Sequence, residues 1–320
     1  MNLLLASSID PNAVESLERR HHVVSAFSAP EEHLRTAVED RQVVVFRSGV
    51  NISARIMEAG PDLRLLVRAG SGLDNVDVEH ARRQGIRLVR IAGSSAQVVA
   101  EFTFALLLDV ARHVSHADRL LRQGRWPKNK LLGHLLKGKT LGIVGAGNIG
   151  SRVGQLGSAW GMKALGCVAN PTEECAARLR AKGITLTDFD TVLTKADFVC
   201  LHVPLTAATR HMIDERALSR MKPGAFLVNV ARGGVVDEEA LFHELTAGSR
   251  LGGAALDVHE REGEGTISRF AELPNVVLTP HIGAMAVDSQ REIGVRLVEL
   301  VESFAAGELE AVIRDAELVV

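Results

Sequence analysis

Aromatic residues, cysteines and long apolar runs are all scarce in this chain of 320 residues. It contains no tyrosine and only 4% aromatic residues, which argues against the base-stacking platforms that bind single-stranded nucleic acid. No apolar run approaches the roughly 18–20 residues that cross a bilayer, so we expect no membrane span. The formal net charge is −2 and no block of like charges is present, which argues against a broad nucleic-acid-binding surface.

The three cysteines, Cys167, Cys175 and Cys200, do not form a CxxC pair. This pattern predicts reduced thiols and a cytoplasmic protein. The sequence also lacks an HExxH motif and any cysteine cluster, so we expect no metal site. The first residues, MNLLLASSID, have no basic segment and only a short apolar stretch, which predicts a first strand rather than a secretion signal.

What the chain does contain is a repeated alternation of apolar runs and helix-forming segments. The first runs are rich in Leu and β-branched residues and do not alternate with polar ones, which is typical of parallel strands buried on both faces; they lie at 2–7, 22–27, 42–48, 63–70 and 86–93. A single long helix is predicted from Ser95 to Gly124. A second series of strand-like runs follows at 140–147, 163–170, 197–204, 225–234, 251–260 and 275–284.

The last predicted helix carries one apolar stripe, made of Ile293, Leu297, Leu300, Val301 and Phe304. The residues after it are too few to form a domain, so we expect this segment to return to the first series of strands. Residues 1–97 and 286–320 would then form a substrate domain, and residues 98–285 an inserted cofactor domain. The predicted fold is α/β, with a doubly wound Rossmann domain inserted into a doubly wound, flavodoxin-like parallel-sheet domain. The two crossings between the domains are the expected hinge.

A glycine-rich sequence, LGIVGAGNIG, opens the second series of strands. A buried strand precedes it and a helix-compatible run follows, which is the context of a dinucleotide-binding GxGxxG motif. We expect Gly145 to allow the tight turn, Gly147 to let the backbone approach a pyrophosphate, and Gly150 to let helix and strand pack closely. The N-terminus of the helix supplies N–H groups for the phosphates.

One part of the dinucleotide motif is missing. An acidic residue about 20 positions after the glycines usually holds the adenosine ribose. Val168, Ala169 and Asn170 stand at that place, and no Arg or Lys there could hold a 2′-phosphate. We expect NAD as the cofactor, with NADP as the open alternative.

Polar residues follow several predicted strands, at the edge where open parallel sheets bind ligands. Taken singly, each is more often a solvated charge, a structural histidine or a helix cap. Together they predict a site with cations, carboxylates and an imidazole: Arg232, Asp257, Glu262 and His281 in the second series, and Arg47, Ser48, Arg68, Gly70, Ser71 and Gly72 in the first. His113 and His116 are expected to lie on a solvated helix face.

Through these segments the chain resembles the D-isomer-specific 2-hydroxyacid dehydrogenase family, and within it the phosphoglycerate dehydrogenases. The shared motifs are VRAGSGLDNVD, VAEFTFALLLDVAR, LKGKTLGIVGAGNIG, LHVPLT, VNVARGGVVDEEAL, GGAALDV and TPHIGA, which span nearly the whole chain. The resemblance implies a homodimer built through the cofactor domains, and we expect a form without the regulatory extension of many phosphoglycerate dehydrogenases.

The resemblance also implies an activity, which is NAD-dependent conversion between a D-2-hydroxy acid and its 2-keto acid. His281 would act as the acid or base at the carbonyl oxygen and Glu262 would be its partner. Arg232 would bind the carboxylate of the substrate, and Asp257 the nicotinamide carboxamide. Backbone amides at Gly70–Gly72 would hold the same carboxylate, and the other cofactor contacts would be Asn148, Ile149, Val203, Pro204, Thr209, Ala231 and Gly283.

The substrate follows less directly from the sequence. Arg47, Arg68 and Lys128 match the cations that phosphoglycerate dehydrogenases use for the distal phosphate, so we expect 3-phosphoglycerate and 3-phosphohydroxypyruvate. Another anionic 2-keto acid stays open, such as glyoxylate, hydroxypyruvate or a phosphonate. A non-catalytic dinucleotide sensor of the same fold and an S-adenosylmethionine methyltransferase are further alternatives. Val168, Ser95 and Gly263, which depart from the family pattern, favour a specialised substrate.

Overall fold

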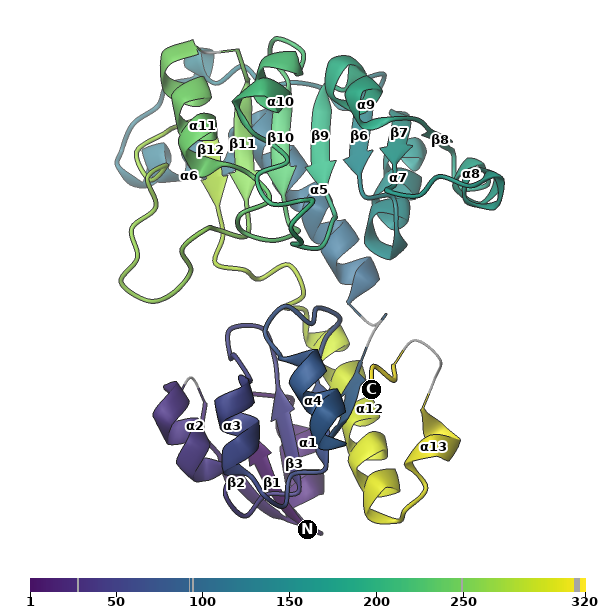
Figure 1. The fold of residues 1–320 in the computed structure, drawn as a ribbon. Helices are drawn as coiled ribbons and strands as arrows, with labels where there is room; N and C mark the ends of the chain where they lie inside the picture. The colour runs from purple at the N-terminus through teal and green to yellow at the C-terminus, as the bar shows by residue number, and fades with distance from the viewer. Residues whose placement is uncertain (28, 92, 94, 249, 314–316) are drawn as a thin grey trace. The chain divides into compact units, whose positions relative to one another are not determined.

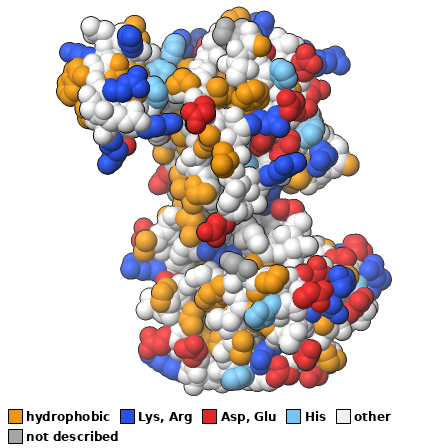
Figure 2. All heavy atoms as spheres, turned by 90° about the vertical axis from the view of Figure 1, so that its left-hand side faces the viewer, with side chains coloured by type: hydrophobic (Ala, Val, Ile, Leu, Met, Phe, Trp, Pro, Cys, Tyr) orange, Lys and Arg blue, Asp and Glu red, His pale blue; other side chains and the backbone are white. Residues whose placement is uncertain are grey.

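The computed structural model describes residues 1–27, 29–91, 93, 95–248, 250–313 and 317–320. They form two compact units, one of Met1–Ser95 with Met285–Val320 and the other of Ala96–Ala284. On the face drawn in Figure 2, acidic and basic side chains are interspersed on both units. Within the described ranges, no helix combines the length and the apolar character needed to cross a membrane.

The unit that holds both ends of the chain is built on a five-stranded parallel sheet (Figure 1), in the order β2-β1-β3-β4-β5. The strands are β1 (Asn2–Leu5), β2 (His22–Ser25), β3 (Val43–Phe46), β4 (Leu65–Arg68) and β5 (Arg87–Arg90). Helices follow them in alternation: α1 (Pro11–Glu18), α2 (Glu31–Ala37), α3 (Ala54–Ala59), α4 (Val78–Gln84), and, after the inserted unit, α12 (Val287–Ala305) and α13 (Leu309–Val312).

Each face of this sheet carries its own apolar core. Helices α1 and α12 pack on one face, where the apolar stripe of α12 is buried against β1, β3 and β4. Helices α2, α3 and α4 cover the other face. The last residues of the chain extend beside β5, since Leu318 and Val89 form an antiparallel bridge. Helix α12 therefore completes a core that strands β1, β3 and β4 begin.

The second unit is built on a seven-stranded parallel sheet, in the order β12-β11-β10-β9-β6-β7-β8. The strands are β6 (Thr140–Val144), β7 (Lys163–Cys167), β8 (Ile184–Leu186), β9 (Phe198–Leu201), β10 (Phe226–Asn229), β11 (Gly253–Leu256) and β12 (Val276–Leu278). The helical segments are α5 (Ala96–Arg112), α6 (Val114–Arg122), η1 (Lys128–Lys130), α7 (Asn148–Ala159), α8 (Glu173–Arg180), α9 (Phe189–Lys195), α10 (Glu215–Arg220), α11 (Glu238–His243) and η2 (Glu244–Gly248).

Helices α5 and α7 contribute to the core on one face of this sheet, and α9, α10 and α11 to the core on the other. The first strand of the unit, β6, pairs with both β7 and β9, so the direction of winding reverses between β6 and β9. Such a reversal is the switch point at which Rossmann sheets bind ligands. The two strand orders confirm the predicted fold class, with a Rossmann-type sheet and a flavodoxin-like sheet.

The prediction of one continuous helix up to Gly124 is wrong. The helix breaks at His113, which has a left-handed backbone with φ +57°. In a continuous helix the carbonyl of Ala111 would accept from residue 115, but here it accepts from the amide of His134 at 2.8 Å. The amide of Ser115 turns instead to the Asp109 carboxylate, at 2.7 Å. A contact from a segment about 20 residues further along thus ends α5.

Candidate active site

The glycine loop lies at the switch point, between the end of β6 and the start of α7. Gly145 has φ +93°, and a Cβ atom there would lie 2.6 Å from the carbonyl oxygen of His202. At Gly150 a Cβ atom would lie 2.3 Å from the carbonyl oxygen of Gly145. Neither position accepts a side chain, because the loop, β9 and the first turn of α7 approach one another too closely.

Gly147 differs from these two glycines. Its φ is −79°, and no described protein atom lies within 4 Å of the Cβ position. Gly147 and Asn148 are exposed, and within the described residues no side chain caps the N-terminus of α7. Open backbone at the positive end of a helix fits a pyrophosphate. The residues present therefore suit a bound dinucleotide.

The adenosine end of the site carries no acidic group where one is usual. Val168 follows β7 and packs half-buried against the core, and Ala169 and Asn170 are exposed. Glu173 and Glu174 come only in the first turn of α8, where Thr172 caps the helix. The ribose hydroxyls would thus meet an apolar side chain and an amide rather than a carboxylate.

The segment after β9 contacts the glycine loop directly. A Cβ atom at Gly145 would meet Cγ1 of Val203 at 2.8 Å. The hydroxyl of Thr209 donates to the carbonyl of Pro204 at 2.6 Å and accepts from the amide of Thr206 at 2.8 Å, which closes the segment into a compact loop. The structure therefore brings Val203, Pro204 and Thr209 together beside Gly145.

The predicted histidine and glutamate meet in space. Nδ1 of His281 lies 2.9 Å from Oε2 of Glu262, and the side chains are 29% and 40% exposed. The other carboxylate oxygen of Glu262 accepts the amide of His259 at 3.1 Å. Burial alone would raise the pKa of the Glu262 carboxyl, but the hydrogen bond and charge of His281 and the amide of His259 outweigh it, so the pKa lies below its ordinary value. The pair can hold the imidazole in one orientation with Nε2 left for a reacting group.

Arg232 lies in the loop after β10, where its guanidinium donates to the carbonyl of Ala231 at 2.7 Å. The side chain of Asn229 shapes this loop: its amide donates to the carbonyl of Arg232 at 3.0 Å, and its oxygen accepts the amide of Ala231 at 3.0 Å. A Cβ atom at Gly233 would lie 1.9 Å from the carbonyl oxygen of His259. The loop with Arg232 thus packs directly on the segment that leads to Glu262.

Asp257 is only 1% exposed and is bonded within the protein. Its carboxylate accepts the hydroxyl of Thr279 at 2.7 Å and the amides of Ile282 and Gly283 at 2.9 Å each. Its carbonyl oxygen also accepts the amide of His281 at 2.7 Å. Asp257 therefore anchors the backbone at and after His281, which has a left-handed backbone with φ +54°. Gly283, predicted as a cofactor contact, is part of this arrangement.

The other predicted substrate contacts lie in the unit with both chain ends, except Lys128. Arg47 follows β3 and is half-buried; its guanidinium donates to the carbonyl of Ser8 and to Sδ of Met285, and burial lowers its pKa. Ser48 and Ser71 are exposed, and Gly70 and Gly72 are half-buried. Lys128 is exposed in η1 of the other unit.

Arg68 is 4% exposed and its guanidinium is bonded inside the unit. Nε donates to the side chain of Asn75 and Nη1 to the carbonyl of Ala69, and the group lies over the ring of Phe46. The amide of Asn75 also donates to the carbonyls of Arg47 and Val50. Asn75 and Asn229, which the sequence reasoning did not single out, are alike in holding a loop with an arginine. The motif GLDNVD is the sequence feature that could have pointed to Asn75.

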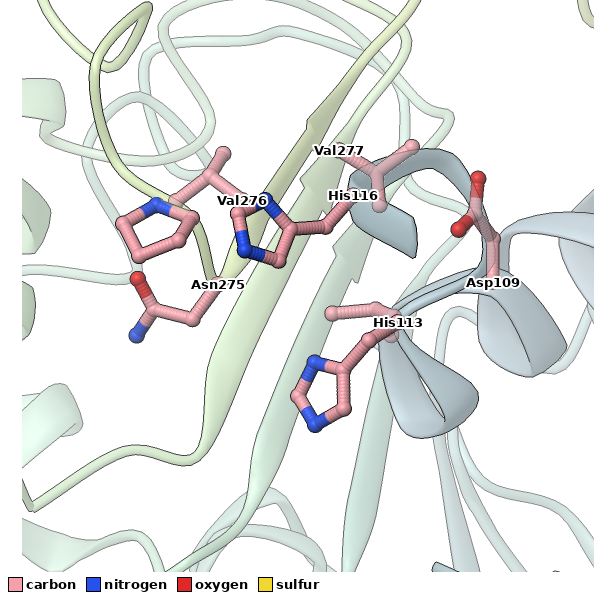
Figure 3. Close-up of a pocket in the computed structure, with 8 residues that line it drawn as sticks. Asp109, His113, His116, Asn275, Val276 and Val277 are labelled. Atoms are coloured by element: carbon pink, nitrogen blue, oxygen red, sulfur yellow. The ribbon is translucent and has the colours of Figure 1, made fainter. Parts of the chain in front are cut away.

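A small pocket lies elsewhere in the second unit, between α5, α6 and the first residues of β12 (Figure 3). The rings of His113 and His116 and the amide of Asn275 line it. Because Asn275 and Val276 are at the amino end of β12, this pocket is at the opposite edge of the sheet from the glycine loop. Burial, together with the charges of Arg119, His113 and Arg125, lowers the pKa of His116. The pocket is separate from the site described above.

Comparison with known proteins agrees with this geometry. Residues 104–283 match the family described as D-isomer specific 2-hydroxyacid dehydrogenase, NAD binding domain. The hydroxypyruvate reductase of Thermotoga maritima is 39% identical over 295 residues, which cover 91% of this chain and 94% of that protein. The D-3-phosphoglycerate dehydrogenase of a Synechocystis species is 35% identical over 305 residues, 95% of this chain, but the chain spans only 54% of its length.

Solved structures give the same result over the whole chain. The TT0316 protein of Thermus thermophilus is similar with a TM-score of 0.89 and 32% identity, and both chains are fully covered. The D-lactate dehydrogenase of Aquifex aeolicus, solved with NAD and lactic acid, has a TM-score of 0.86 and 28% identity over 100% of this chain and 99% of that one. The predicted resemblance is therefore confirmed, and the chain belongs to the D-isomer-specific 2-hydroxyacid dehydrogenase family.

Proposed function

We propose that the protein is an NAD-dependent oxidoreductase that converts a short anionic 2-keto acid and its D-2-hydroxy acid into one another. The observation that carries the proposal is the contact between His281 and Glu262 in the same unit as the open glycine loop and Arg232. A bound nicotinamide supplies or accepts the hydride. The chain's own residues must then bind the substrate, orient it and move one proton.

In the proposed reduction, His281 donates the proton from Nε2 to the carbonyl oxygen of the substrate as that oxygen gains charge. Glu262 stabilises the protonated imidazole through Nδ1 and fixes the direction of the ring. Arg232 binds the substrate carboxylate, a task that suits a planar guanidinium. In the reverse direction, His281 accepts the hydroxyl proton of the 2-hydroxy acid.

Asp257 has an added part in this proposal. Asp257 would bind the nicotinamide carboxamide, since a carboxylate has about four acceptor directions and three are used within the protein. The amides of the first turn of α7, Asn148 and Ile149 among them, would hold the pyrophosphate. Val203, Pro204, Thr209 and Ala231 would contact the rest of the dinucleotide.

For the substrate we propose 3-phosphoglycerate and 3-phosphohydroxypyruvate first, because Arg47, Arg68 and Lys128 match cations of the phosphoglycerate dehydrogenases. A specific observation favours hydroxypyruvate as the second candidate. Arg68 is buried, and its Nε and Nη1 already donate to Asn75 and Ala69 inside the unit. One relative, of which the chain covers 94%, is a hydroxypyruvate reductase.

We further propose a cytoplasmic homodimer. Five apolar side chains in the segment 114–135 are more than half exposed, which fits a surface that a second copy of the chain covers; they are Val114, Leu121, Trp126, Leu132 and Leu135. The buried free thiols of Cys167 and Cys200 support a reducing compartment.

The experiment that tests the proposal is a panel of 2-keto acids followed by nicotinamide absorbance with NADH and with NADPH. The panel includes 3-phosphohydroxypyruvate, hydroxypyruvate and glyoxylate. We expect His281→Ala to abolish reduction while the fluorescence titration of NADH stays within about twofold of wild type, because the imidazole acts on the substrate. Equal loss of turnover and of NADH binding would contradict the role of His281. NADH binding without turnover on every acid would favour a dinucleotide sensor.

A further inference from the structure

We propose that His211 is a positioning residue that couples the loop carrying Arg232 to the loop carrying Glu262. The inference rests on the proposed function, in which Arg232 binds the substrate carboxylate and Glu262 orients His281.

The backbone around His211 runs beside the loop that follows Arg232. The amide of His211 donates to the carbonyl of Gly234 at 2.7 Å, and the amide of Ile213 donates to the carbonyl of Val235 at 3.2 Å. The amide of Asp237 returns a bond to the carbonyl of Ile213 at 3.0 Å, so the two segments form a short parallel bridge. The position of the Arg232 loop thus depends on the backbone at 211–213.

The imidazole of His211 contacts the second loop. Nε2 lies 2.9 Å from Oε1 of Glu260, while Nδ1 lies 3.9 Å from Oδ2 of Asp237. Glu260 is two residues before Glu262, and the amide of His259 already bonds to the carboxylate of Glu262. A displacement of Glu260 therefore also moves Glu262, because residues 259–262 form a turn closed by this hydrogen bond.

Glu260 also contacts a second acidic residue, Glu238. The amide of Glu260 donates to the carboxylate of Glu238 at 2.8 Å, and the amide of Glu238 lies 3.4 Å from Oε1 of Glu260. This exchange places two carboxylates close together, with Asp237 next to them. Carboxylates that lie near one another repel, and positive charge near them reduces this repulsion. The charge of Arg269 acts on both Glu238 and Glu260. The imidazole of His211 faces both Glu260 and Asp237.

The backbone of His211 is itself unusual. It has φ +50°, one of three positive values among the described residues other than glycine. In this conformation its amide reaches one loop while its ring reaches the other. Asparagine tolerates a left-handed backbone better than most residues, so His211→Asn removes the imidazole and keeps the local chain path.

The test uses the full-length protein and four variants: His211→Asn, Glu260→Gln, the double variant and His243→Asn. His243 is the matched control, because its Nε2 lies 3.4 Å from Oε1 of Glu239 on the exposed part of α11, and within the described part of the chain it bonds to neither loop. We expect His211→Asn and Glu260→Gln each to lower kcat/KM for the best 2-keto acid about tenfold. If the two groups are coupled, the kcat/KM of the double variant should be no lower than that of the less active single variant. NADH affinity and the His243→Asn activity should stay within about twofold of wild type.

A second readout does not depend on turnover. Carboxyl titration by carbon-13 NMR, with Glu262 assigned by comparison with Glu262→Gln, should show the pKa of Glu262 moving up towards its ordinary value in His211→Asn, because the loop no longer holds it against His281. Circular dichroism checks that each variant is folded. If His211→Asn does not fold, Glu260→Gln tests the same contact between His211 and Glu260. Multiplicative effects in the double variant, or an unmoved Glu262 titration, would overturn the coupling. If wild type reduces no 2-keto acid, the proposed function fails while the NMR result still decides the coupling.

Discussion

Replacing Asp257 by asparagine is the most informative single change that the structure offers. The substitution keeps the shape of the side chain but turns one carboxylate oxygen into an amide donor. Asp257 is 1% exposed, and its carboxylate accepts hydrogen bonds from three donors: the Thr279 hydroxyl and the amides of Ile282 and Gly283. Whichever way the new side chain is turned, its NH2 group faces at least one donor.

The magnitude follows from this geometry. One buried N–H is left without an acceptor, which costs about 1–3 kcal/mol. The remaining bonds lose the charge of the carboxylate, and charge-assisted bonds are about twice as strong as neutral ones. We therefore expect the free energy of unfolding to fall by about 2–4 kcal/mol. Because His281 has φ +54° and Asp257 anchors the backbone at and after it, we also expect kcat to fall at least about tenfold.

Denaturant unfolding measures the first effect, and hydrogen exchange of the peptide 276–284 locates it. Asp214→Asn is the matched control: Asp214 caps α10 by accepting the amide of Ala217 at 2.8 Å, and asparagine caps a helix equally well. It should stay within about 0.5 kcal/mol of wild type. If Asp257→Asn is as stable as this control and the exchange of Ile282 and Gly283 is unchanged, the anchoring role of Asp257 is refuted.

The remaining predictions concern the glycine loop and the pH dependence of stability. Gly147→Ala should leave the free energy of unfolding nearly unchanged, because the methyl group meets no protein atom, and should weaken NADH binding, because the methyl group lies where the pyrophosphate would bind. Gly150→Ala should lower the free energy of unfolding by about 2 kcal/mol, because its methyl group overlaps the carbonyl of Gly145. Unfolding curves and fluorescence titration with NADH measure the two effects, and the opposite pattern would contradict the pyrophosphate assignment. The lowered pKa of Glu262 means that its pair with His281 stabilises the fold above the unfolded-state pKa of about 4.3 and loses this effect as pH falls through the lower folded value. The difference in stability between wild type and Glu262→Gln should therefore shrink from pH 6 to pH 3, and a constant difference would argue against the pair.

The buried parallel strands and the gathering of polar residues at one edge of the sheet follow a pattern that local sequence contains, whereas the pairing of His281 with Glu262 was implied by the family resemblance. Unalternated apolar runs mark strands buried on both faces, and the carboxyl ends of parallel strands share one edge, so residues that follow the strands must gather there. This reasoning places Arg232, Glu262 and His281 in one region without coordinates. The Rossmann order of the second sheet agrees with it.

Other features depend on contacts that no local pattern contains. The break between α5 and α6 arises because the amide of His134 takes the carbonyl of Ala111. The strand β8 escaped prediction since it has only three residues, one of them exposed, at the edge of the sheet. The burial of Arg68 depends on Asn75 and Phe46, and the three bonds of Asp257 come from a segment more than 20 residues away. Hydrogen-bond partners of this kind are set by the fold and not by the neighbours in sequence.

The unit that holds both ends of the chain is discontinuous in sequence, and this has a consequence for biosynthesis. Strands β1–β5 leave the ribosome before the inserted unit, yet the sheet face under α1 is closed only when Ile293, Leu297 and Leu300 of α12 pack on it. The roughly 190 residues of Ala96–Ala284 are made in between, which takes about 10–40 s at 5–20 residues per second. The inserted unit is continuous in the chain and can fold on emerging. The first sheet must wait for α12, and one of its apolar faces stays open to chaperones throughout that interval.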